Sequence, residues 1–313
     1  MVDHAGPRPR FREIHFQARY RYDRHSIYLL GETLVSAATG RIGKKTMQPS
    51  GVITITTDFG HKGPFAAVMK GVIVSRFPQA TIIDLAHDIP AQWPPEAGFW
   101  VSRSYSYFPN GSVHLAIVDP GVGTERDILI VEYDNHYFMA PDNGLLAQML
   151  DSADDAAVFR LDLDSLERLD IPPPSNTFHG RDIFAPIAAE LAAGKTTPVS
   201  IAKPTQEWVP AWLEEPDVTR AKVSGVIVTV DAFGNLISNI DASLVEAFKQ
   251  PTVHVAGHNI EMKTTYGRAK PGEYLALINS FDVLEVARAE SSAAEGLGIE
   301  RGAPITVTDN ITT

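Results

Sequence analysis

From residue 51 onward, apolar residues form short runs separated by polar turns, and the runs follow two periods. Runs rich in β-branched and apolar residues predict buried strands at 51–57, 81–85 and 113–118. Runs with apolar residues at helical spacing predict helices at 65–73, 145–150 and 183–193, and the prolines at 94–95 favour the first turn of another. Because strands alternate with helices, the pattern predicts an α/β fold whose N-terminal sheet is mostly parallel, with helices on both faces.

A second pattern begins after the first set of strands. The runs 128–133 and 136–140 flank Asp134-Asn135, a pair that favours a tight turn between two strands. Beyond residue 221 helical signals become few, and strands are expected at 226–230, 253–256, 274–278 and 305–307. The sequence therefore predicts a smaller, β-rich C-terminal domain.

These patterns divide the chain into four parts. We expect an extension at residues 1–50, an α/β N-terminal domain at 51–202, a linker at 203–221 and a β-rich C-terminal domain at 222–313. Residues 195–221 contain Pro, Thr and Trp and are interpreted as irregular. Residues 1–50 have no clean period and no secretory pattern, so we interpret them as disordered or not native, with Met47 as the start.

Composition narrows the class of protein. The 313 residues are 44% hydrophobic, enough for two domains with cores of their own. The net charge of −11 argues against general binding to nucleic acid or anionic membranes, although residues 1–50 hold 9 basic and 4 acidic side chains. There is no apolar run of about 18 residues that would span a membrane. The absence of cysteine excludes disulfides and thiol catalysis, and it fits a cytoplasmic protein.

Polar side chains follow each of the first three predicted strands. Asp58, the pair His87-Asp88 and Asp119 stand at these strand ends. Because the carboxyl ends of parallel strands meet at one edge of a sheet, where ligands bind, we expect these groups to share a site. The segment 118–126 (VDPGVGTER) turns sharply and carries Asp119 and Arg126 near its ends. The alternative interpretation of this segment is a structural turn with a surface ion pair.

Three other kinds of site were weighed. A kinase is excluded, because the DFG at 58–60 precedes the HGRD at 179–182, the reverse of the kinase order, and no Walker motif is present. A lone histidine such as His179 is by default structural, although its place after a Pro-rich break favours a site. A Mg²⁺ or Zn²⁺ site is a third alternative, although the sequence has no HExxH motif and no tight ligand spacing. Its candidate ligands are Asp58, His87, Asp88, Asp119 and His179.

The second domain contains an amide-rich stretch. Asp231 to Asn235, followed by Ser238-Asn239, is interpreted as a turn. An asparagine amide both donates and accepts hydrogen bonds, so Asn235 could also read the edge of a heterocycle such as adenine.

Together these motifs resemble one family, the S-adenosyl-L-methionine (SAM) hydroxide adenosyltransferases, or SAM hydrolases, which are related to SAM-dependent fluorinases and chlorinases. The resemblance runs from about residue 51 to the C-terminus in the family's order. The matching segments are 56–60 (TTDFG), 69–71 (MKG), 118–126 (VDPGVGTER), 141–144 (PDNG), 177–186 (TFHGRDIFAP), and Asp231 with 233–235 (FGN).

The resemblance implies hydrolysis of SAM to adenosine and L-methionine by a homotrimer with active sites between subunits, without a metal or redox cofactor. It assigns the catalytic triad to Asp119, Arg126 and His179. The substrate-binding residues that it implies are Asp58 for the ribose diol, Asp231 for the methionine amine, Asn235 for adenine, Ser280 at the methionine end, and Trp93 and Tyr266 elsewhere in the pocket.

Two departures from the family pattern bear on the choice of nucleophile. Gly63 stands where many members carry an aspartate, which leaves any contact drawn from that position without support. Phe281 replaces an arginine of the fluorinases, and the halogenases lack the Asp–Arg pair that Asp119 and Arg126 form here. Both features favour water over halide. The alternatives are a chlorinase, a non-catalytic adenosine- or SAM-binding protein, and a metal-dependent phosphoesterase.

Activation of water as the nucleophile requires more than one charged group. Free water has a pKa of about 15.7, and one cation at about 4 Å contributes roughly 4 kcal/mol, or about three pK units. A base and in-line positioning must supply the rest. We therefore hypothesise that Arg126 and His179 orient one water while Asp119 holds them and can take up its proton. The sequence leaves open whether Asp119 or His179 is the base.

Overall fold

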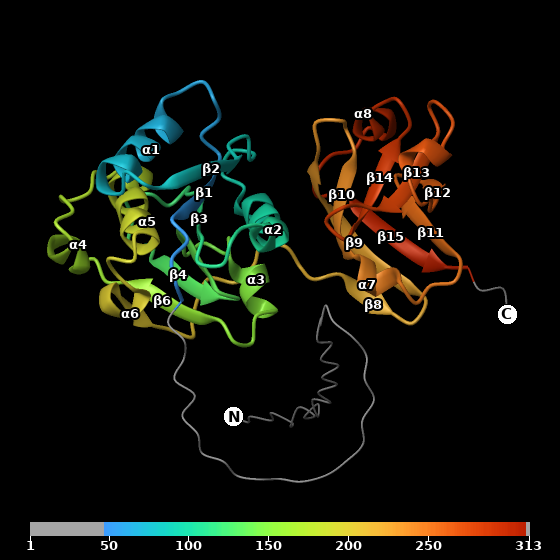
Figure 1. The fold of residues 1–313 in the computed structure, drawn as a ribbon. Helices are drawn as coiled ribbons and strands as arrows, with labels where there is room; N and C mark the ends of the chain where they lie inside the picture. Colours follow the sequence, from blue (N-terminus) through green and yellow to red (C-terminus); the bar gives the residue numbers. More distant parts are fainter. Residues whose placement is uncertain (1–46, 311–313) are drawn as a thin grey trace, which may run out of the picture. The chain divides into compact units, whose positions relative to one another are not determined.

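The computed structural model describes residues 47–310 of the chain. The predicted extension at 1–50 therefore lies outside the described residues, except for its last four positions. In the described part, the strands form two sheets, and different hydrophobic clusters pack against each sheet (Figure 1).

The first sheet contains seven strands in the order β2-β1-β3-β5-β4-β6-β7. Its strands are β1 Val52–Thr57, β2 Thr81–Ala86, β3 Val113–Ile117, β4 Ile128–Tyr133, β5 His136–Pro141, β6 Ala157–Leu161 and β7 Ala202–Pro204. The pairs β1–β2, β1–β3 and β3–β5 are parallel, and β4 and β7 run against the others. Five of the seven strands thus share one direction, as the mostly parallel prediction requires.

The hairpin between β4 and β5 forms where the sequence predicts it. Asp134 and Asn135 both have positive φ, 45° and 60°. Two such residues build the tight turn whose twist matches the flanking strands. The turn aligns Tyr133 with His136 and so fixes the register of the whole pair.

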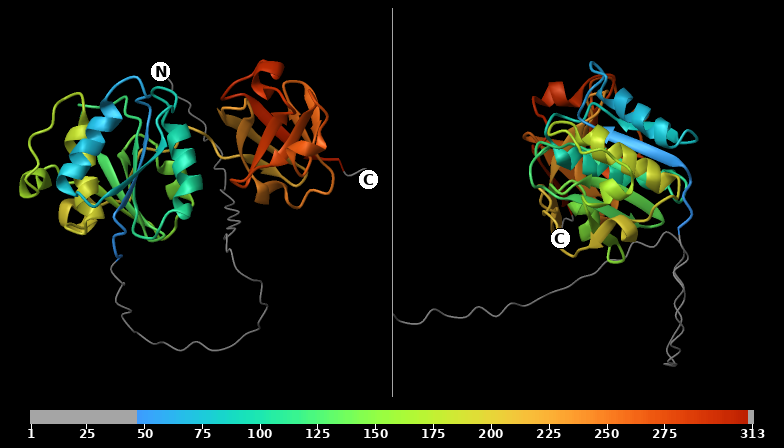
Figure 2. Two further views of the ribbon diagram at one scale, coloured as in Figure 1. Left: turned by 45° about the horizontal axis from the view of Figure 1, so that its top comes forward. Right: turned by 90° about the vertical axis from the view of Figure 1, so that its left-hand side faces the viewer.

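Helices cover both faces of this sheet, as predicted (Figure 2). The helices are α1 Phe65–Arg76, α2 Pro94–Ser104, α3 Ala147–Asp151, α4 Ser165–Arg168, α5 Ala185–Ala192 and α6 Pro198–Ile201. On one face, α1 and α5 pack against Ile53 and Leu115. On the other, α2 packs against Ala116 and Val118. Because alternate residues of β3 point to opposite faces, both cores draw on the same strand.

The interpretation of residues 195–221 as irregular is wrong in part. This stretch contains α6 and β7 and ends with β8 Asp217–Thr219. The strand β7 pairs with β6, and β8 pairs with β9. Each is only three residues long, too short for a hydrophobic period to be visible in the sequence.

The second sheet contains eight strands and curls toward closure. Its elements are β8, β9 Lys222–Val230, β10 Leu236–Asp241, β11 Pro251–Val255, β12 His258–Glu261, β13 Tyr274–Ile278, β14 Val283–Arg288 and β15 Pro304–Asp309, with the short helices α7 Ala242–Val245 and α8 Ala293–Leu297. The strand order is β12-β11-β15-β9-β10-β14-β13. A single bridge between Met262 and Ala276 links the two ends, which gives the predicted β-rich domain a barrel-like form.

The interpretation of residues 231–239 as one turn is correct only for its first half. Ser238 and Asn239 lie in β10 and are buried, 0% and 4% exposed. The Ser238 hydroxyl donates to the Leu284 carbonyl, and the Asn239 amide oxygen accepts from the Val226 N–H, where the β9–β10 register shifts. These polar side chains replace missing ladder bonds, which is why they stand in a strand.

No helix formed by residues 47–310 is long and apolar enough to cross a membrane. The helix α1 has 12 residues, whereas a span needs about 20.

Candidate active site

The site begins at the end of β3, where the chain turns away from the sheet. Gly123 has φ +78°, and a Cβ placed there would lie 2.1 Å from the backbone oxygen of Asn176. A side chain could therefore neither adopt this backbone nor fit this space. Glycine lets the loop that carries Asp119 and Arg126 approach the segment that leads to His179.

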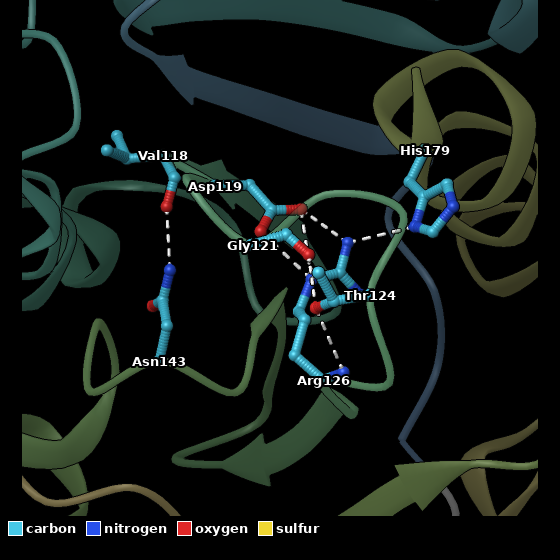
Figure 3. Close-up of polar contacts among 7 residues, drawn as sticks. All are labelled: Val118, Asp119, Gly121, Thr124, Arg126, Asn143 and His179. Carbon is cyan, nitrogen blue, oxygen red and sulfur yellow. Dashed lines mark hydrogen bonds and ion pairs between the residues drawn. The ribbon is translucent and has the colours of Figure 1, made fainter. Parts of the chain in front are cut away.

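The three predicted catalytic side chains meet in this loop (Figure 3). The Arg126 Nε donates to both oxygens of Asp119, at 2.9 and 3.0 Å, and its Nη2 also contacts Asp119 Oδ2. The same Nη2 lies 3.0 Å from His179 Nδ1. Only 10% of the Arg126 side chain and 6% of the Asp119 side chain are exposed, so the pair is not a surface ion pair. Charge-assisted hydrogen bonds of this kind are shorter and stronger than hydrogen bonds between neutral groups.

The contact with Arg126 determines the protonation of His179. A guanidinium only donates hydrogen bonds, so His179 Nδ1 must accept, and the neutral ring then carries its proton on Nε2. Burial lowers the pKa of His179 below its usual 6.5, and the nearby charge of Arg126 lowers it further. At neutral pH His179 is thus an uncharged ring that donates from Nε2.

A second contact holds the base of the loop (Figure 3). The Asn143 side-chain amide donates to the Val118 carbonyl at 2.8 Å, immediately before Asp119. The Trp212 indole N–H in turn donates to the Asn143 carbonyl, also at 2.8 Å. The predicted segment 141–144 therefore supports the loop from the neighbouring strand, β5.

Asp119 and His179 line a cavity of about 350 Å³, here called the N-terminal cavity. Asp58, at the end of β1, lines the same cavity, and its Oδ2 accepts from the Gln92 N–H at 2.9 Å. The expectation that polar groups at the strand ends share a site therefore holds for Asp58 and Asp119. It does not hold for His87 and Asp88, which follow β2 and do not line this cavity.

The sequence missed the aromatic part of this cavity. Phe59, Phe65 and Phe178 all line it, with ring centroids 5.5–6.0 Å apart. Phe65 is 49% exposed, although it begins α1. Hydrophobic periodicity assigns such a residue to the core. The only signal for an aromatic site in the sequence was therefore the presence of Phe59 and Phe178 inside the motifs 58–60 and 177–182.

The candidate metal ligands at the end of β2 have other partners. His87 Nδ1 lies 2.8 Å from the Thr57 hydroxyl, and its Nε2 lies 2.9 Å from Asp84. Asp88 lies 3.4 Å from His61. Within residues 47–310, no three His, Asp or Glu side chains are grouped so that they could hold a metal ion.

Four of the predicted binding residues line a different space, here called the C-terminal cavity, of about 790 Å³. They are Asp231, Asn235, Tyr266 and Ser280. Asp231 Oδ1 accepts from the Asn235 N–H, and Asp231 Oδ2 accepts from the Asn235 side-chain amide, both at 2.9 Å. The carboxylate therefore accepts from both the main-chain and the side-chain N–H groups of Asn235 and orients its amide. No described residue lines both cavities.

Glu285 is a member of the C-terminal cavity that the sequence analysis did not find. It is 2% exposed, and burial raises the pKa of its carboxyl. It accepts from the Tyr266 hydroxyl at 2.7 Å and from the Asn279 amide at 3.1 Å. Glu285 thus fixes one wall of this cavity. A charged residue in the apolar run of β14 was the available signal, but that strand was not predicted.

Trp93 lies apart from the other predicted residues. Its ring contacts Trp212 edge to face at 5.8 Å, and the Arg301 guanidinium lies 5.2 Å from its centroid. It lines neither cavity.

Comparison with known proteins identifies the family. The sequence model of the SAM hydroxide adenosyltransferase N-terminal domain matches residues 53–201, and that of the C-terminal domain matches residues 225–306. The chain belongs to the SAM hydroxide adenosyltransferase family. Each of the two cavities lies on a different matched segment, apart from Trp100 of α2 in the second.

Individual relatives are similar to this chain over most of their length. An (R)-S-adenosyl-L-methionine hydrolase of Thermus thermophilus is 35% identical over 80% of this chain and 96% of its own, and one of Salinispora tropica is 34% identical over 84% and 99%. A fluorinase of Actinoplanes is 25% identical over 82% and 97%. A solved structure of an uncharacterised conserved protein from Thermotoga maritima matches 82% of this chain and 99% of its own, with TM-score 0.75 and 31% identity.

At the two positions that depart from the family pattern, Phe281 and Gly63, the neighbouring groups are aromatic. Phe281 packs against Trp100 at 5.4 Å, edge to face. A Cβ at Gly63 would lie 2.8 Å from the Phe65 ring. At both positions this chain has apolar groups where the family pattern has a charged side chain.

Proposed function

We propose that this protein hydrolyses SAM to adenosine and L-methionine through attack of one water on C5′. The observation that carries the proposal is the contact of Arg126 with both Asp119 and His179 beside a cavity that also holds Asp58. The 34–35% identity to proteins named SAM hydrolases supports it, and fluorinases are more distant.

The roles follow from what each group can donate or accept. The Nε2–H of His179 can donate to the oxygen of a water. The charge of Arg126, whose Nε and Nη2 are bonded to Asp119 and His179, stabilises the hydroxide that develops as the proton leaves. The sulfonium needs no acid, because it departs as a neutral thioether. Catalysis therefore consists of generating and positioning the nucleophile.

The contacts favour Asp119 as the proton acceptor. His179 Nδ1 is already occupied by Arg126, and its Nε2 carries a proton, so neither nitrogen is free to accept from water. A carboxylate has about four lone-pair directions, and Asp119 uses three for Arg126. The proton passes from water to Asp119 and then to solvent, while the oxygen forms the bond to C5′ and the C5′–S bond breaks.

Asp58 suits the ribose, because one carboxylate can accept from both the 2′- and 3′-hydroxyls. Asn235 and Asp231 suit adenine and the methionine amine, with Tyr266 and Ser280 beside them. SAM must contact both groups at once, yet they line separate cavities of one chain. We therefore propose a homotrimer in which the N-terminal cavity of one subunit meets the C-terminal cavity of another.

The decisive experiment follows the fate of solvent oxygen. Purified protein is incubated with SAM in ¹⁸O-labelled water, with and without chloride, and the nucleosides are analysed by mass spectrometry. We expect ¹⁸O in the 5′-hydroxyl of adenosine at both chloride concentrations. Formation of 5′-chloro-5′-deoxyadenosine would instead identify a halogenase, and tight adenosine binding without consumption of SAM would identify a binding protein.

Subunit sharing has its own test. Asp119→Asn and Asp231→Ala inactivate different cavities, so each variant alone should have little activity. Unfolding and refolding them together should restore about a quarter of the sites, those that combine two intact cavities. If each site lies within one chain, the mixture stays as inactive as its components.

A further inference from the structure

The N-terminal cavity has an aromatic wall, formed by Phe59, Phe65 and Phe178, that the proposed catalytic steps do not use. The Phe65 and Phe178 rings meet edge to face at 5.5 Å, and Phe59 contacts both, at 6.0 and 5.9 Å. Each ring lines the cavity together with Asp58, Asp119 and His179. A large apolar surface beside three polar groups indicates a ligand that is neither fully polar nor fully apolar at this point.

The wall already holds one cation. The Arg181 guanidinium lies 5.3 Å from the centroid of Phe178. Aromatic faces attract cations within about 6 Å of the ring centre, because the π-system concentrates negative charge there. Phe65 lines the same cavity and is 49% exposed, so it is accessible to a ligand there.

The position of the Phe65 ring depends on Gly63. A Cβ at Gly63 would lie 2.8 Å from both Cδ2 and Cε2 of Phe65, which is closer than two nonbonded carbon atoms approach each other. Any side chain at position 63 would therefore displace the ring. The Phe65 ring can therefore occupy its position only because residue 63 has no side chain.

We propose that the aromatic wall recognises the sulfonium cation of the substrate. This inference rests on the proposed function, because in-line attack by a water at Arg126 and His179 puts the departing sulfur on the far side of C5′ from that water. Asp58 holds the ribose in the same cavity, and the aromatic wall is an apolar part of its lining that the reacting groups leave unused. Phe59 directly follows Asp58, and Phe178 directly precedes His179.

Such a wall distinguishes the substrate from its products. The sulfonium is positively charged, whereas the thioether of methionine and the hydroxymethyl group of adenosine are neutral. A cation–π contact therefore weakens as the C5′–S bond breaks and the charge is lost. The wall favours binding of SAM over retention of methionine, and it does so without a carboxylate that could compete with water for C5′.

The test compares two ligands that differ in charge at this one position. S-adenosyl-L-homocysteine has a neutral thioether, and a stable analogue with an ammonium-bearing carbon in place of the sulfonium is a cation. Calorimetry gives both dissociation constants for the intact protein. In Phe65→Leu, which keeps an apolar side chain but removes the ring, we expect the cationic ligand to lose about 3- to 30-fold in affinity. The neutral ligand should lose less than about twofold, and Phe65→Tyr should restore the wild-type ratio.

Gly63→Ala provides an independent variant at a distance from the ligand. It should reduce the preference for the cation in the wild-type background and have no further effect in Phe65→Leu, because the displaced ring is then absent. Tyr107→Leu, an exposed aromatic residue that lines neither cavity, is the matched control and should change nothing. Equal losses for both ligands in Phe65→Leu would overturn the proposal and leave Phe65 as an apolar wall. If neither ligand binds the wild-type protein and SAM is not consumed, the proposed function itself fails.

Discussion

A group of polar side chains that includes histidine lies at each end of strand β3, and the two groups differ in burial and in hydrogen bonding. At the carboxyl end, Asp119 and Arg126 are an ion pair beside a cavity, and His179 contacts the cation. At the amino end, His114 lies between Thr54 and His136, with no more than 2% of any of the three exposed. Titratable groups are thus present at both ends, but only one end is open to a ligand.

The amino-end cluster is satisfied within itself. The Thr54 hydroxyl lies 2.8 Å from His114 Nδ1, and His114 Nε2 lies 3.1 Å from His136 Nδ1. The His114 ring stacks on Phe138 at 5.0 Å. Burial lowers the pKa of His114 to about 3, so the ring is neutral under ordinary conditions. These contacts link adjacent strands and occupy both ring nitrogens of His114.

The comparison shows that the two histidines differ in whether their second ring nitrogen is bonded to another protein group. In His114, both nitrogens are bonded to protein groups. In His179, Arg126 takes one nitrogen and leaves Nε2–H for the cavity. The following predictions separate the two ends, beginning with the largest effect.

Arg126→Lys should abolish most of the activity while it leaves the fold intact. The lysine keeps the charge beside Asp119, but one ammonium cannot also hold His179 as a planar guanidinium does. We expect kcat to fall about 10²- to 10³-fold, and steady-state kinetics with SAM measures this. Arg160→Lys, which alters an ion pair with Asp127 outside both cavities, is the control. A kcat within about threefold of wild type would remove Arg126 from the mechanism.

Gly123→Ala should be nearly as damaging, because it separates the loop from the Asn176 backbone. A Cβ at 2.1 Å from the Asn176 oxygen cannot be accommodated without movement of about 1 Å, which can cost about 10²-fold in rate. Gly272→Ala shares the positive φ, +80°, but has open space around it, so it isolates the close approach from backbone strain. Equal kcat values in the two variants would contradict this role for Gly123.

The amino-end cluster should make stability fall in mild acid. The pKa of His114 is lower in the folded protein than its unfolded value of 6.5, so the unfolded chain binds the extra proton. The stabilisation is complete above pH 6.5 and is lost as the pH falls toward 3. From this group alone, the free energy of unfolding should be about 2 kcal/mol lower at pH 5 than at pH 7.

Denaturant unfolding at several pH values measures this slope. His114→Gln should flatten it, whereas His258→Gln, which changes an exposed histidine, should keep the wild-type slope. An unchanged slope in His114→Gln would show that the buried pair does not titrate as described.

The smallest effect concerns the pH dependence of catalysis. Because burial and Arg126 lower the pKa of His179, the neutral ring that accepts from Arg126 persists below pH 6.5. Protonation at lower pH breaks that contact, so kcat/KM should decline with a midpoint below 6.5. A midpoint above 6.5 in the pH–rate profile would contradict the assignment.

Much of the architecture was predictable from the sequence. The rule that parallel strands present their carboxyl ends at one edge led to Asp58 and Asp119 without any motif. The hairpin at Asp134-Asn135 and the helix at 65–73 followed from turn chemistry and period. The strands β6, β10 and β14 were missed, because polar residues interrupt their apolar pattern: Arg160, Ser238 and Glu285 stand inside them.

The rest of the site depends on contacts between distant segments. The sequence cannot indicate that the Phe65 ring occupies the space beside Gly63, since its apolar character alone fits a core position equally well. It also left the base undecided, and it gives no sign of the contact between Arg126 and Nδ1 of His179, 53 positions apart, on which our proposal of Asp119 rests. Side-chain geometry at such separations is fixed by the assembled fold, not by local pattern.

The contact of Trp212 with Asn143 has a practical consequence. Its indole N–H bonds the main chain of the residue that holds the Val118 carbonyl, one position before Asp119. Motion of the loop 118–126 therefore alters the electrostatic surroundings of Trp212, one of the four tryptophans in the chain. Intrinsic fluorescence thus contains a contribution that can follow movement of this loop in real time without an added label.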